Sequence, residues 1–409
     1  MIKELKQGET LIAKGPTRIN ILEGMVEVFG KLISADEGER GKEGVSNDTE
    51  LIIPSADQYP VYATEESKIE IYTSNPEENI KTIEENSIPK EWIDIKDNII
   101  KLIGKSKESH PLKIMVLGLS HGKTTLIKYL ANSLKREGLN GGYLDSDLGQ
   151  QMMYAPTTIS IASIEESIIS GEDLDPAFTK FIGATYPKEN LKFIVSHATN
   201  NLIEKFIAEH QNSDFILVDT DGWIKSEPGV VYKLFFIKTV EPDAIIVFHD
   251  DDIEELKVIE KKIKSDKQKE LFLLKQENKY YYEKDKEDRR FLRQSRFSKV
   301  LSDFQKITIP LDDIKFVKNE YDKEQNKIIE RDIPVRHLVT LPYHYVLISL
   351  LDENSQMIKI GLLFSINLEK NYFLIFSDLS YTEQLEVRKV LIGSLRLSTK
   401  GNHQGYLYL

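Results

Sequence analysis

The fold of this chain is predicted most directly by the stretch Ile114-Met-Val-Leu-Gly118-Leu-Ser-His-Gly122-Lys123-Thr124-Thr125. An apolar run typical of a buried strand is followed by a glycine turn and then by a helical segment that reaches about Glu137. In a P-loop, backbone N–H groups at the start of such a helix surround the phosphates of a nucleotide. The lysine reaches the β- and γ-phosphate oxygens, and the next hydroxyl ligates Mg²⁺. The pattern therefore predicts a nucleotide site.

The predicted phosphate loop departs from the usual spacing. The standard pattern has four residues between its two glycines, whereas this chain has three between Gly118 and Gly122. Either Leu117 occupies the first glycine position, or the loop is one residue shorter. The alternative is a chance Gly-Lys-Thr at a helix start, but the strand and helix on either side favour the nucleotide site. Its predicted nucleotide-binding residues are Gly118, Leu119, Ser120, His121, Gly122, Lys123, Thr124 and Thr125, with Thr124 also a metal ligand.

Strand and helix patterns alternate after this loop. Gly142-Tyr-Leu-Asp145, Phe215-Ile-Leu-Val218 and Ala244-Ile-Ile-Val-Phe248 are strand candidates separated by helical segments. Such alternation predicts an α/β fold in which helices cover both faces of a parallel sheet. The highly charged residues 251–300 are expected to be mostly helical.

The two ends of the chain have patterns typical of β-structure. Short alternating runs such as Met25-Val-Glu-Val-Phe29 precede a helical connector, and strand-like runs, Ile333-Pro-Val335 among them, return after Ile307. The fold class is therefore predicted as α/β, with a central P-loop domain and a parallel sheet, flanked by β-rich domains. The predicted domains are residues 1–95, 96–308 and 309–409.

Carboxylates follow two of the predicted strands. Asp145 and Asp147 come after the second strand, and alternation along an extended segment would place them on the same side. Asp219 ends the apolar run from Phe215 in the manner of a Walker B acid. Carboxylates at the ends of parallel strands can hold Mg²⁺ or accept a hydroxyl proton. The alternative for Asp145 and Asp147 is turn chemistry without function.

Arginine is concentrated in one place. Only eleven of the 54 basic residues are arginine, yet Arg289, Arg290, Arg293 and Arg296 fall within eight residues. Arg289, Arg293 and Arg296 share one face of a helix, because they are spaced i, i+4, i+7. The planar guanidinium grips phosphate with two parallel hydrogen bonds, so these three are predicted to neutralise charge on a transferred phosphoryl group. A solvated helix face is the alternative.

Trp223 is one of two tryptophans and follows the strand that ends at Asp219. An aromatic face beside a nucleotide can stack an unpaired base. A core tryptophan beneath a loop is an equal alternative from position alone.

The composition limits the class of protein. The chain has 409 residues, 40% apolar residues and no cysteine, which excludes disulfides and thiolate metal sites. It has no signal-peptide core and no apolar run near the ~20 residues that span a bilayer, so a cytoplasmic protein without membrane partners is expected. The net charge of −12 argues against a non-specific duplex binder but leaves room for a local basic cleft.

Four motifs, in this order, resemble one known family. They are Gly24-Met-Val-Glu-Val-Phe-Gly30, Asp145-Ser-Asp147-Leu-Gly-Gln150 with Pro156, Thr220-Asp-Gly222-Trp223, and the arginine cluster. Together they resemble the polynucleotide 5′-hydroxyl kinases of tRNA and pre-rRNA processing and of messenger-RNA cleavage factors, with an archaeal-like character. The chain departs from that family's pattern at its short loop and at Thr157, where the family usually has glycine.

The resemblance implies a function and a set of roles. It implies transfer of the ATP γ-phosphate to the 5′-hydroxyl of RNA or DNA whose 5′ end is exposed, with ATP bound between the first two domains and RNA-processing proteins as partners. Lys123 would contact the γ-phosphate, and Asp147 would be the base and a metal-side carboxylate. Further implied roles are substrate binding by Gln150, Thr220, Gly222 and Trp223, a lid formed by Arg289, Arg293 and Arg296, and Mg²⁺ binding by Thr124, Asp147 and Asp219.

Two other functions remain possible from the sequence. The first is an ATP-bound scaffold of an RNA-processing assembly. Such a scaffold needs contacts to the nucleotide, but it needs no catalytic carboxylate, no substrate-binding residues Thr220–Trp223 and no arginine lid. The second is a regulatory GTPase, which predicts an Asn-Lys-x-Asp signature that the chain lacks.

Overall fold

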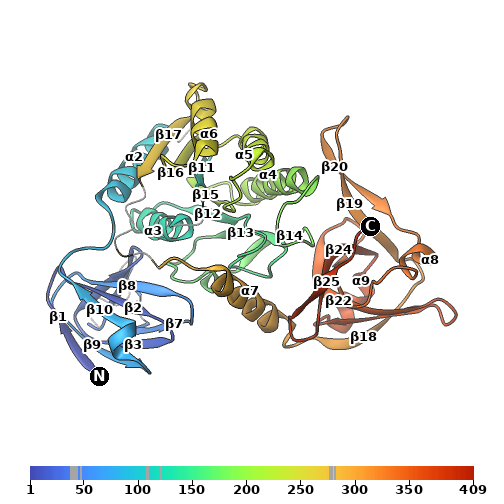
Figure 1. The fold of residues 1–409 in the computed structure, drawn as a ribbon, viewed down its shortest axis with the longest axis horizontal. Coiled ribbons are helices and arrows are strands. Elements are labelled where there is room, and N and C mark those ends of the chain that lie inside the picture. The colour runs from blue at the N-terminus through green and yellow to red at the C-terminus, as the bar shows by residue number, and fades with distance from the viewer. Residues whose placement is uncertain (37–44, 47, 107–109, 120–121, 276–279, 281) are drawn as a thin grey trace.

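The computed structural model describes residues 1–409 except 37–44, 47, 107–109, 120–121, 276–279 and 281. The described chain forms three parts in sequence order: an amino-terminal β part, a central α/β part and a carboxyl-terminal β part (Figure 1). Among the described helices, none has the length and apolar character needed to cross a membrane.

The amino-terminal part consists of two sheets around one apolar core. One sheet has the order β1-β9-β3-β7 and the other the order β10-β2-β8-β4-β5-β6. Strand β8 buries every second side chain, as expected for a strand with one face in a core. The elements are β1 (Ile2–Leu5), β2 (Thr10–Lys14), β3 (Thr17–Glu23), β4 (Met25–Val28), β5 (Lys31–Ser34), β6 (Val45–Ser46), β7 (Glu50–Ile53), β8 (Gln58–Ala63), β9 (Ser67–Thr73), α1 (Pro76–Asn79) and β10 (Ile80–Ile83).

Helix α2 (Lys90–Ser106) connects the first two parts. Ile95, Ile99 and Ile103 repeat every four residues and pack into the core of the central part. The predicted domain limit at residue 95 falls inside this helix, and the limit at residue 308 falls inside β18 (Gln305–Pro310). Both limits stay predictions.

The central sheet has the order β14-β13-β12-β15-β11-β16-β17. Five of these strands are parallel to one another. At one edge, β13 pairs antiparallel with both β12 and β14. The predicted parallel sheet is present, and the β13–β14 hairpin extends it with antiparallel pairings at one edge. The strands are β11 (Leu112–Leu117), β12 (Gly141–Asp145), β13 (Thr158–Ser163), β14 (Pro176–Phe181), β15 (Phe215–Asp219), β16 (Ala244–His249) and β17 (Glu270–Lys275).

Helices cover both faces of the central sheet, as predicted. Helices α2 and α3 pack in one apolar cluster with β11 and β15, and α4, α5 and α6 pack in a second cluster on the other face. Strand β17 lies within the segment that was expected to be mostly helical, because its pairing with β16 outweighs its charged surroundings. The remaining central elements are α3 (Lys123–Arg136), the 3₁₀ turn η1 (Gly171–Asp173), α4 (Leu191–Glu209), α5 (Glu227–Val240), α6 (Glu254–Lys264) and α7 (Lys286–Leu301).

The carboxyl-terminal part is built on one eight-stranded sheet of order β18-β23-β22-β21-β24-β19-β20, with β25 paired to β24. The segment around Ile333 was predicted as β-structure, which is wrong: Pro334 caps a short helix, since proline has no N–H for a ladder and suits a helix start. The elements after β18 are β19 (Lys315–Asp322), β20 (Lys327–Asp332), α8 (Val335–Leu338), β21 (Val346–Leu351), β22 (Met357–Asn367), β23 (Tyr372–Ser377), α9 (Tyr381–Glu386), β24 (Lys389–Leu397) and β25 (His403–Tyr406).

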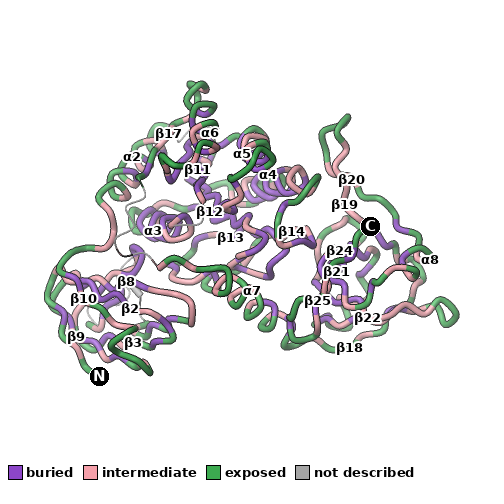
Figure 2. Tube along the Cα trace, in the orientation of Figure 1, coloured by how far each residue is buried: buried purple, intermediate pink, exposed green. Residues whose placement is uncertain are grey.

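Helix α7 lies between the central and carboxyl-terminal parts (Figure 1). Asp285 caps its start by accepting hydrogen bonds from the N–H groups of Glu287 and Asp288, at 2.7 and 2.8 Å. Phe297 and Leu301 are its only buried residues, and both join the apolar cluster that connects the two parts. Most of α7 is therefore exposed or half-buried, as Figure 2 shows.

Thr157 occupies a strained position behind the site. Its φ is +79°, in the left-handed region that favours glycine. The residue is fully buried, and its hydroxyl has no hydrogen-bond partner among the described residues. Its carbonyl accepts hydrogen bonds from the N–H groups of Ile182 and Gly183, at 2.9 and 3.1 Å, which fixes this conformation.

We expect Thr157→Gly to stabilise the protein by about 1 kcal/mol. Relief of the left-handed strain and removal of an unsatisfied buried hydroxyl each contribute on the order of 1–3 kcal/mol, while the extra freedom of glycine in the unfolded chain offsets about 0.5–1 kcal/mol and the lost packing offsets part of the rest. Urea unfolding followed by tryptophan fluorescence measures the change. A loss of stability would contradict the strain argument.

Candidate active site

One large cavity is lined by residues of the amino-terminal and central parts. Its volume is about 1690 Å³, larger than the roughly 300–1,000 Å³ of common small-molecule pockets. Phe29 and Tyr59 line it from the amino-terminal part, Lys123 and Thr124 from the P-loop helix, and Arg293 from α7. The cavity has room for a nucleotide together with the end of a second substrate.

The two loop glycines are required by the ring of Phe248. Gly118 and Gly122 have φ values of +155° and +79°, and Gly122 caps α3. A Cβ atom at either position would lie 2.8–2.9 Å from Phe248 carbons. Leu117 is the last residue of β11, so Gly118 is the first residue after the strand. The predicted contacts of Ser120 and His121 lie outside the described residues.

Lys123 and Thr124 start α3 next to a buried acid. The Lys123 ammonium donates to the Leu119 carbonyl of its own loop, and burial lowers the pKa of this lysine. The Thr124 hydroxyl donates to Asp219 Oδ2 at 2.7 Å. Tyr143 donates to the same oxygen at 3.3 Å. Thr124 and Asp219, both predicted metal ligands, are therefore adjacent.

Asp145 and Asp147 have different surroundings. Strand β12 ends at Asp145, so the alternation expected to bring both onto one side does not continue to Asp147. Asp145 is buried and accepts hydrogen bonds from the N–H groups of Asp147 and Met152, at 3.0 and 2.8 Å. Asp147 lines the cavity, and its Oδ1 accepts from the N–H groups of Gly149 and Gln150, at 2.9 and 3.0 Å. Asp145 therefore shapes the turn that presents Asp147.

Burial raises the pKa of all three acids. For Asp145 the raised pKa is due to burial and then to the charges of Asp219 and Asp147. For Asp147, burial and the charge of Asp221 raise the pKa, while Lys123 opposes them. For Asp219, burial raises the pKa, and Lys123 and Thr124 oppose it. Burial therefore disfavours the charged forms of these carboxylates, and a cation beside the loop would favour them.

Residues Thr220–Trp223, here called the clasp, follow β15 into the cavity wall. The Thr220 hydroxyl donates to the Val116 carbonyl at 2.8 Å, so it is bound within the sheet. Gly222 and Trp223 line the cavity, as does Gln150, whose side chain donates to the Gly149 carbonyl at 3.0 Å. Trp223 is half-buried and packs on the apolar core, while stacking on a base stays a prediction.

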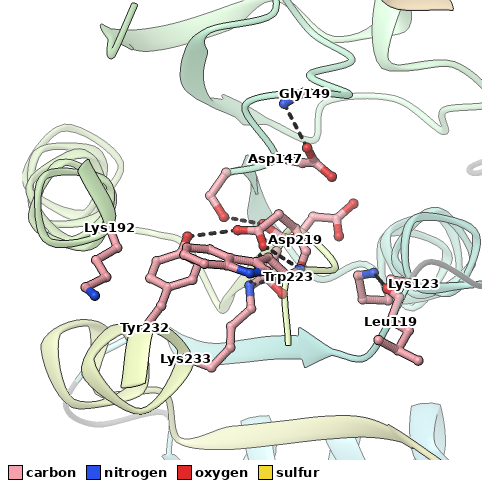
Figure 3. Close-up of polar contacts among 12 residues, drawn as sticks. Leu119, Lys123, Asp147, Gly149, Lys192, Asp219, Trp223, Tyr232 and Lys233 are labelled. Atoms are coloured by element: carbon pink, nitrogen blue, oxygen red, sulfur yellow. Dashed lines mark hydrogen bonds and ion pairs between the residues drawn. The ribbon is translucent and has the colours of Figure 1, made fainter. Parts of the chain in front are cut away.

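A buried lysine that the sequence did not indicate holds the clasp. Lys233 of α5 is fully buried, lies 3.1 Å from Asp221 Oδ1 and donates to the Asp221 carbonyl at 2.8 Å. Tyr232 donates to Asp221 Oδ2 at 2.8 Å, and the Trp223 N–H donates to Oδ1 at 2.8 Å (Figure 3). Asp221 thus fixes the turn that carries Trp223. A lysine within the otherwise apolar run Val230–Ile237 was the only available signal.

The three arginines predicted to share a face all line the cavity, whereas Arg290 is exposed. Arg293 donates to the Gly149 carbonyl at 3.1 Å, within the Asp147 turn. Arg289 donates to the Lys284 carbonyl at 2.7 Å. Arg296 instead forms an ion pair with Glu172 at 2.9 Å. Of these three arginines, Arg293 is therefore the one whose side chain is hydrogen-bonded to the turn that carries Asp147.

The amino-terminal Gly24–Gly30 motif packs on the helix that follows the P-loop. Asn132 of α3 donates to the Phe29 carbonyl at 2.8 Å, and Arg136 donates to the Gly30 carbonyl at 3.2 Å. Gly30 has a φ of +83°, and a Cβ there would crowd Tyr129 and Ser133. This motif holds the amino-terminal part against α3, beside the cavity.

These features define a P-loop nucleotide-binding protein. A strand, a glycine turn pressed against a ring, a lysine, and a threonine bonded to a strand-end acid are the parts of such a site.

Comparison with known proteins gives the family. Residues 119–302 match the model described as mRNA cleavage and polyadenylation factor CLP1 P-loop. A polyribonucleotide 5′-hydroxyl-kinase of Methanocaldococcus jannaschii is 28% identical over 73% of this chain and 90% of its own length. One from Pyrococcus furiosus is 27% identical over 73% and 91%. The expected resemblance to polynucleotide 5′-hydroxyl kinases, with its archaeal character, is confirmed.

Solved structures agree on the fold. The structure of a wild-type Clp1p–Pcf11p complex superposes with a TM-score of 0.72 at 16% identity, over 97% of both chains. A second Clp1p–Pcf11p structure gives 0.73 at 14% identity. The predicted α/β fold class with flanking β-rich parts is confirmed, and the family supports ATP binding.

We expect Lys233→Met to lower the free energy of unfolding of the central part by about 3–5 kcal/mol, since it leaves the Asp221 carboxylate buried without its ion-pair partner. Adding Asp221→Asn should recover at least half of that loss, because the amide keeps an acceptor for Tyr232 and removes the charge. Urea unfolding followed by tryptophan fluorescence measures both variants. A loss below about 1 kcal/mol in Lys233→Met would show that the pair does not hold this turn.

Proposed function

We propose that this chain is an ATP-dependent polynucleotide 5′-hydroxyl kinase that acts on RNA. The observation that carries the proposal is that Lys123, Asp147 and Arg293 line one cavity beside the clasp. They come from α3, the turn after β12, and α7. A phosphate-binding cation, a carboxylate and a second cation in one enclosed site are the groups that phosphoryl transfer needs. A scaffold that only binds nucleotide would need neither the carboxylate nor the second cation.

ATP and Mg²⁺ fit the residues present. The space in front of Gly118 and Gly122 is shaped by Phe248, and α3 directs its first N–H groups there. Thr124 and Asp219 supply the hydroxyl and carboxylate oxygens that Mg²⁺ takes alongside phosphate, with Asp147 as a further candidate ligand. When bound, Mg²⁺ would neutralise charge on the β- and γ-phosphates.

Asp147 would act as the general base. Two backbone N–H groups hold its Oδ1, while Oδ2 has no hydrogen bond to any described residue. Asp147 would take the proton of the 5′-hydroxyl as that oxygen bonds to the γ-phosphorus. The bond from the γ-phosphorus to the β–γ bridging oxygen breaks, and its electron pair leaves with ADP. Asp147 is half-buried in the cavity wall, where it can reach a hydroxyl bound in the cavity.

Other residues would position the substrates. Lys123 would hold the β- and γ-phosphates, and Arg293 with Arg289 would balance charge on the moving phosphoryl group. Trp223 would stack on the first base, with Gln150 and Gly222 beside it. Arg296 is held by Glu172, so its part would be smaller. RNA-processing proteins as partners, activity on DNA, and a cytoplasmic location complete the proposal.

The direct test is incubation with γ-labelled ATP and matched RNA oligonucleotides that carry either a 5′-hydroxyl or a 5′-phosphate. We expect label on the 5′-hydroxyl strand alone. We also expect Asp147→Asn to lower kcat at least 100-fold with little change in ATP affinity, because an amide cannot accept the proton. Tight ATP binding without label transfer by the wild type would favour the scaffold.

Arg293→Lys tests the arginine face. The substitution keeps the charge but loses the planar fork, so kcat should fall about tenfold or more while the KM for RNA changes little. Arg290→Lys is the matched control, since Arg290 lies on the same helix but is exposed, and it should behave as wild type. Equal kinetics of the two variants would mean that the arginines form a solvated helix face.

A further inference from the structure

A second lysine of the P-loop helix also faces the cavity. Thr124, Thr125, Lys128 and Tyr129 of α3 all line it, as expected for residues three to five apart on one helix face. Lys128 is 7% exposed, so its stem is buried while its end reaches the cavity. Neither the motifs nor the proposed chemistry uses this residue.

Lys128 has no hydrogen bond or ion pair with any described residue. Its ammonium lies over the ring of Phe29, 5.5 Å from the ring centre, near the ~6 Å limit of such contacts. Asp57 is the acid with the largest favourable effect on Lys128, but Asp57 is already paired with Lys284 at 2.7 Å. A buried cation is therefore left facing the cavity.

The charges around Lys128 do not compensate for its burial. Burial lowers the pKa of Lys128 to about 8. Asp57, Asp173 and Asp219 oppose that shift, and Lys284 adds to it. Tyr59, which lines the same wall, has a pKa far above the neutral range and stays uncharged. An anion placed beside Lys128 would stabilise its charged form.

The position of Lys128 on α3 indicates which anion. It lies four residues beyond Thr124, a rise of about 6 Å along the helix. The Cα–Cβ bonds of a helix tilt toward its amino terminus, so the Lys128 side chain leaves α3 on the phosphate-loop side, and its ammonium lies over the Phe29 ring. The β- and γ-phosphates are assigned to Lys123 and Thr124 at that loop. The next phosphate inward from these is the α-phosphate.

We propose that Lys128 binds the α-phosphate of the nucleotide and so acts as a second cationic residue of the phosphate site. This rests on the proposed function only in that the ligand is a nucleotide. Phosphoryl transfer to RNA is not required, so nucleotide affinity tests the proposal separately from kinase activity.

The experiment measures the affinity of the full chain for ADP by calorimetry, and for AMP and adenosine by competition with ADP. Lys128→Met should weaken ADP and AMP by the same factor, about tenfold, and leave adenosine unchanged. Lys123→Met should weaken ADP much more than AMP. Lys135→Met is the matched control, because Lys135 is on the same helix outside the cavity, and it should bind as wild type. Thermal unfolding without nucleotide confirms that each variant is folded.

The pH dependence supplies a second readout. The protonated lysine binds the anion better, so wild-type ADP affinity should fall as pH rises from 7.5 to 9.5 through the pKa of free Lys128. Phosphate ionisation is complete by then, since its second pKa is about 6. Lys128→Arg should bind ADP nearly as wild type but without this fall, because arginine stays charged. The proposal would be overturned if Lys128→Met weakened adenosine as much as ADP, or weakened neither. It would also be overturned if ADP affinity still fell with pH in Lys128→Arg, since that result would assign the titration to Lys123.

Discussion

The position of Asp219 is the constraint on which the rest of the site depends. Its carboxylate accepts the Thr124 hydroxyl at 2.7 Å, which joins the P-loop helix to the central strand β15. Its carbonyl accepts both the N–H and the hydroxyl of Ser146, at 3.1 and 2.6 Å, so the turn that carries Asp147 is held by the same residue. The clasp begins at the next residue. One strand end therefore sets the relative positions of the phosphate loop, the proposed base and the substrate-binding turn.

Electrostatics explain why this arrangement suits polyanionic substrates despite a net charge of −12. The acids are buried close together, where a low dielectric strengthens every interaction. Lys123 opposes the raised pKa of Asp147 and Asp219, and Lys233 pairs with Asp221. Arg293 and Lys128 add positive charge to the lining of the same cavity. The charge that matters is thus local, and the sum over the whole chain says little about it.

Local patterns predicted the features that depend on local chemistry. The strand, turn and helix around Gly118–Thr125 were readable because periodicity and glycine conformation act over a few residues. The arginine face was readable because helix spacing alone places Arg289, Arg293 and Arg296 together. The family resemblance supplied the order of the motifs, but the roles of individual residues still await experiment.

Features that depend on distant contacts were not readable. The β13–β14 hairpin pairs by contacts that no periodic pattern marks. The end of β12 determines which acid lines the cavity. The carboxylate of Asp145 accepts hydrogen bonds from the N–H groups of Met152 and Asp147, and Asp147 is left to line the cavity. Arg296 meets Glu172, a residue 124 positions away. Lys128 and Lys233 looked like ordinary helix residues, and only the packing of the amino-terminal part and of the clasp shows them as buried cations.

In the proposed reaction, one cavity brings the γ-phosphate and an RNA 5′ end together at Asp147. A crystal structure of the chain with a non-hydrolysable ATP analogue, Mg²⁺ and a short 5′-hydroxyl RNA tests it most directly. We expect the 5′-oxygen about 3 Å from the Asp147 carboxylate and in line with the γ-phosphorus, Arg293 on the γ-phosphate, and the first base against Trp223. A structure in which the nucleotide occupies the loop while the RNA 5′ end binds elsewhere, with Asp147 facing only its own turn, would contradict it.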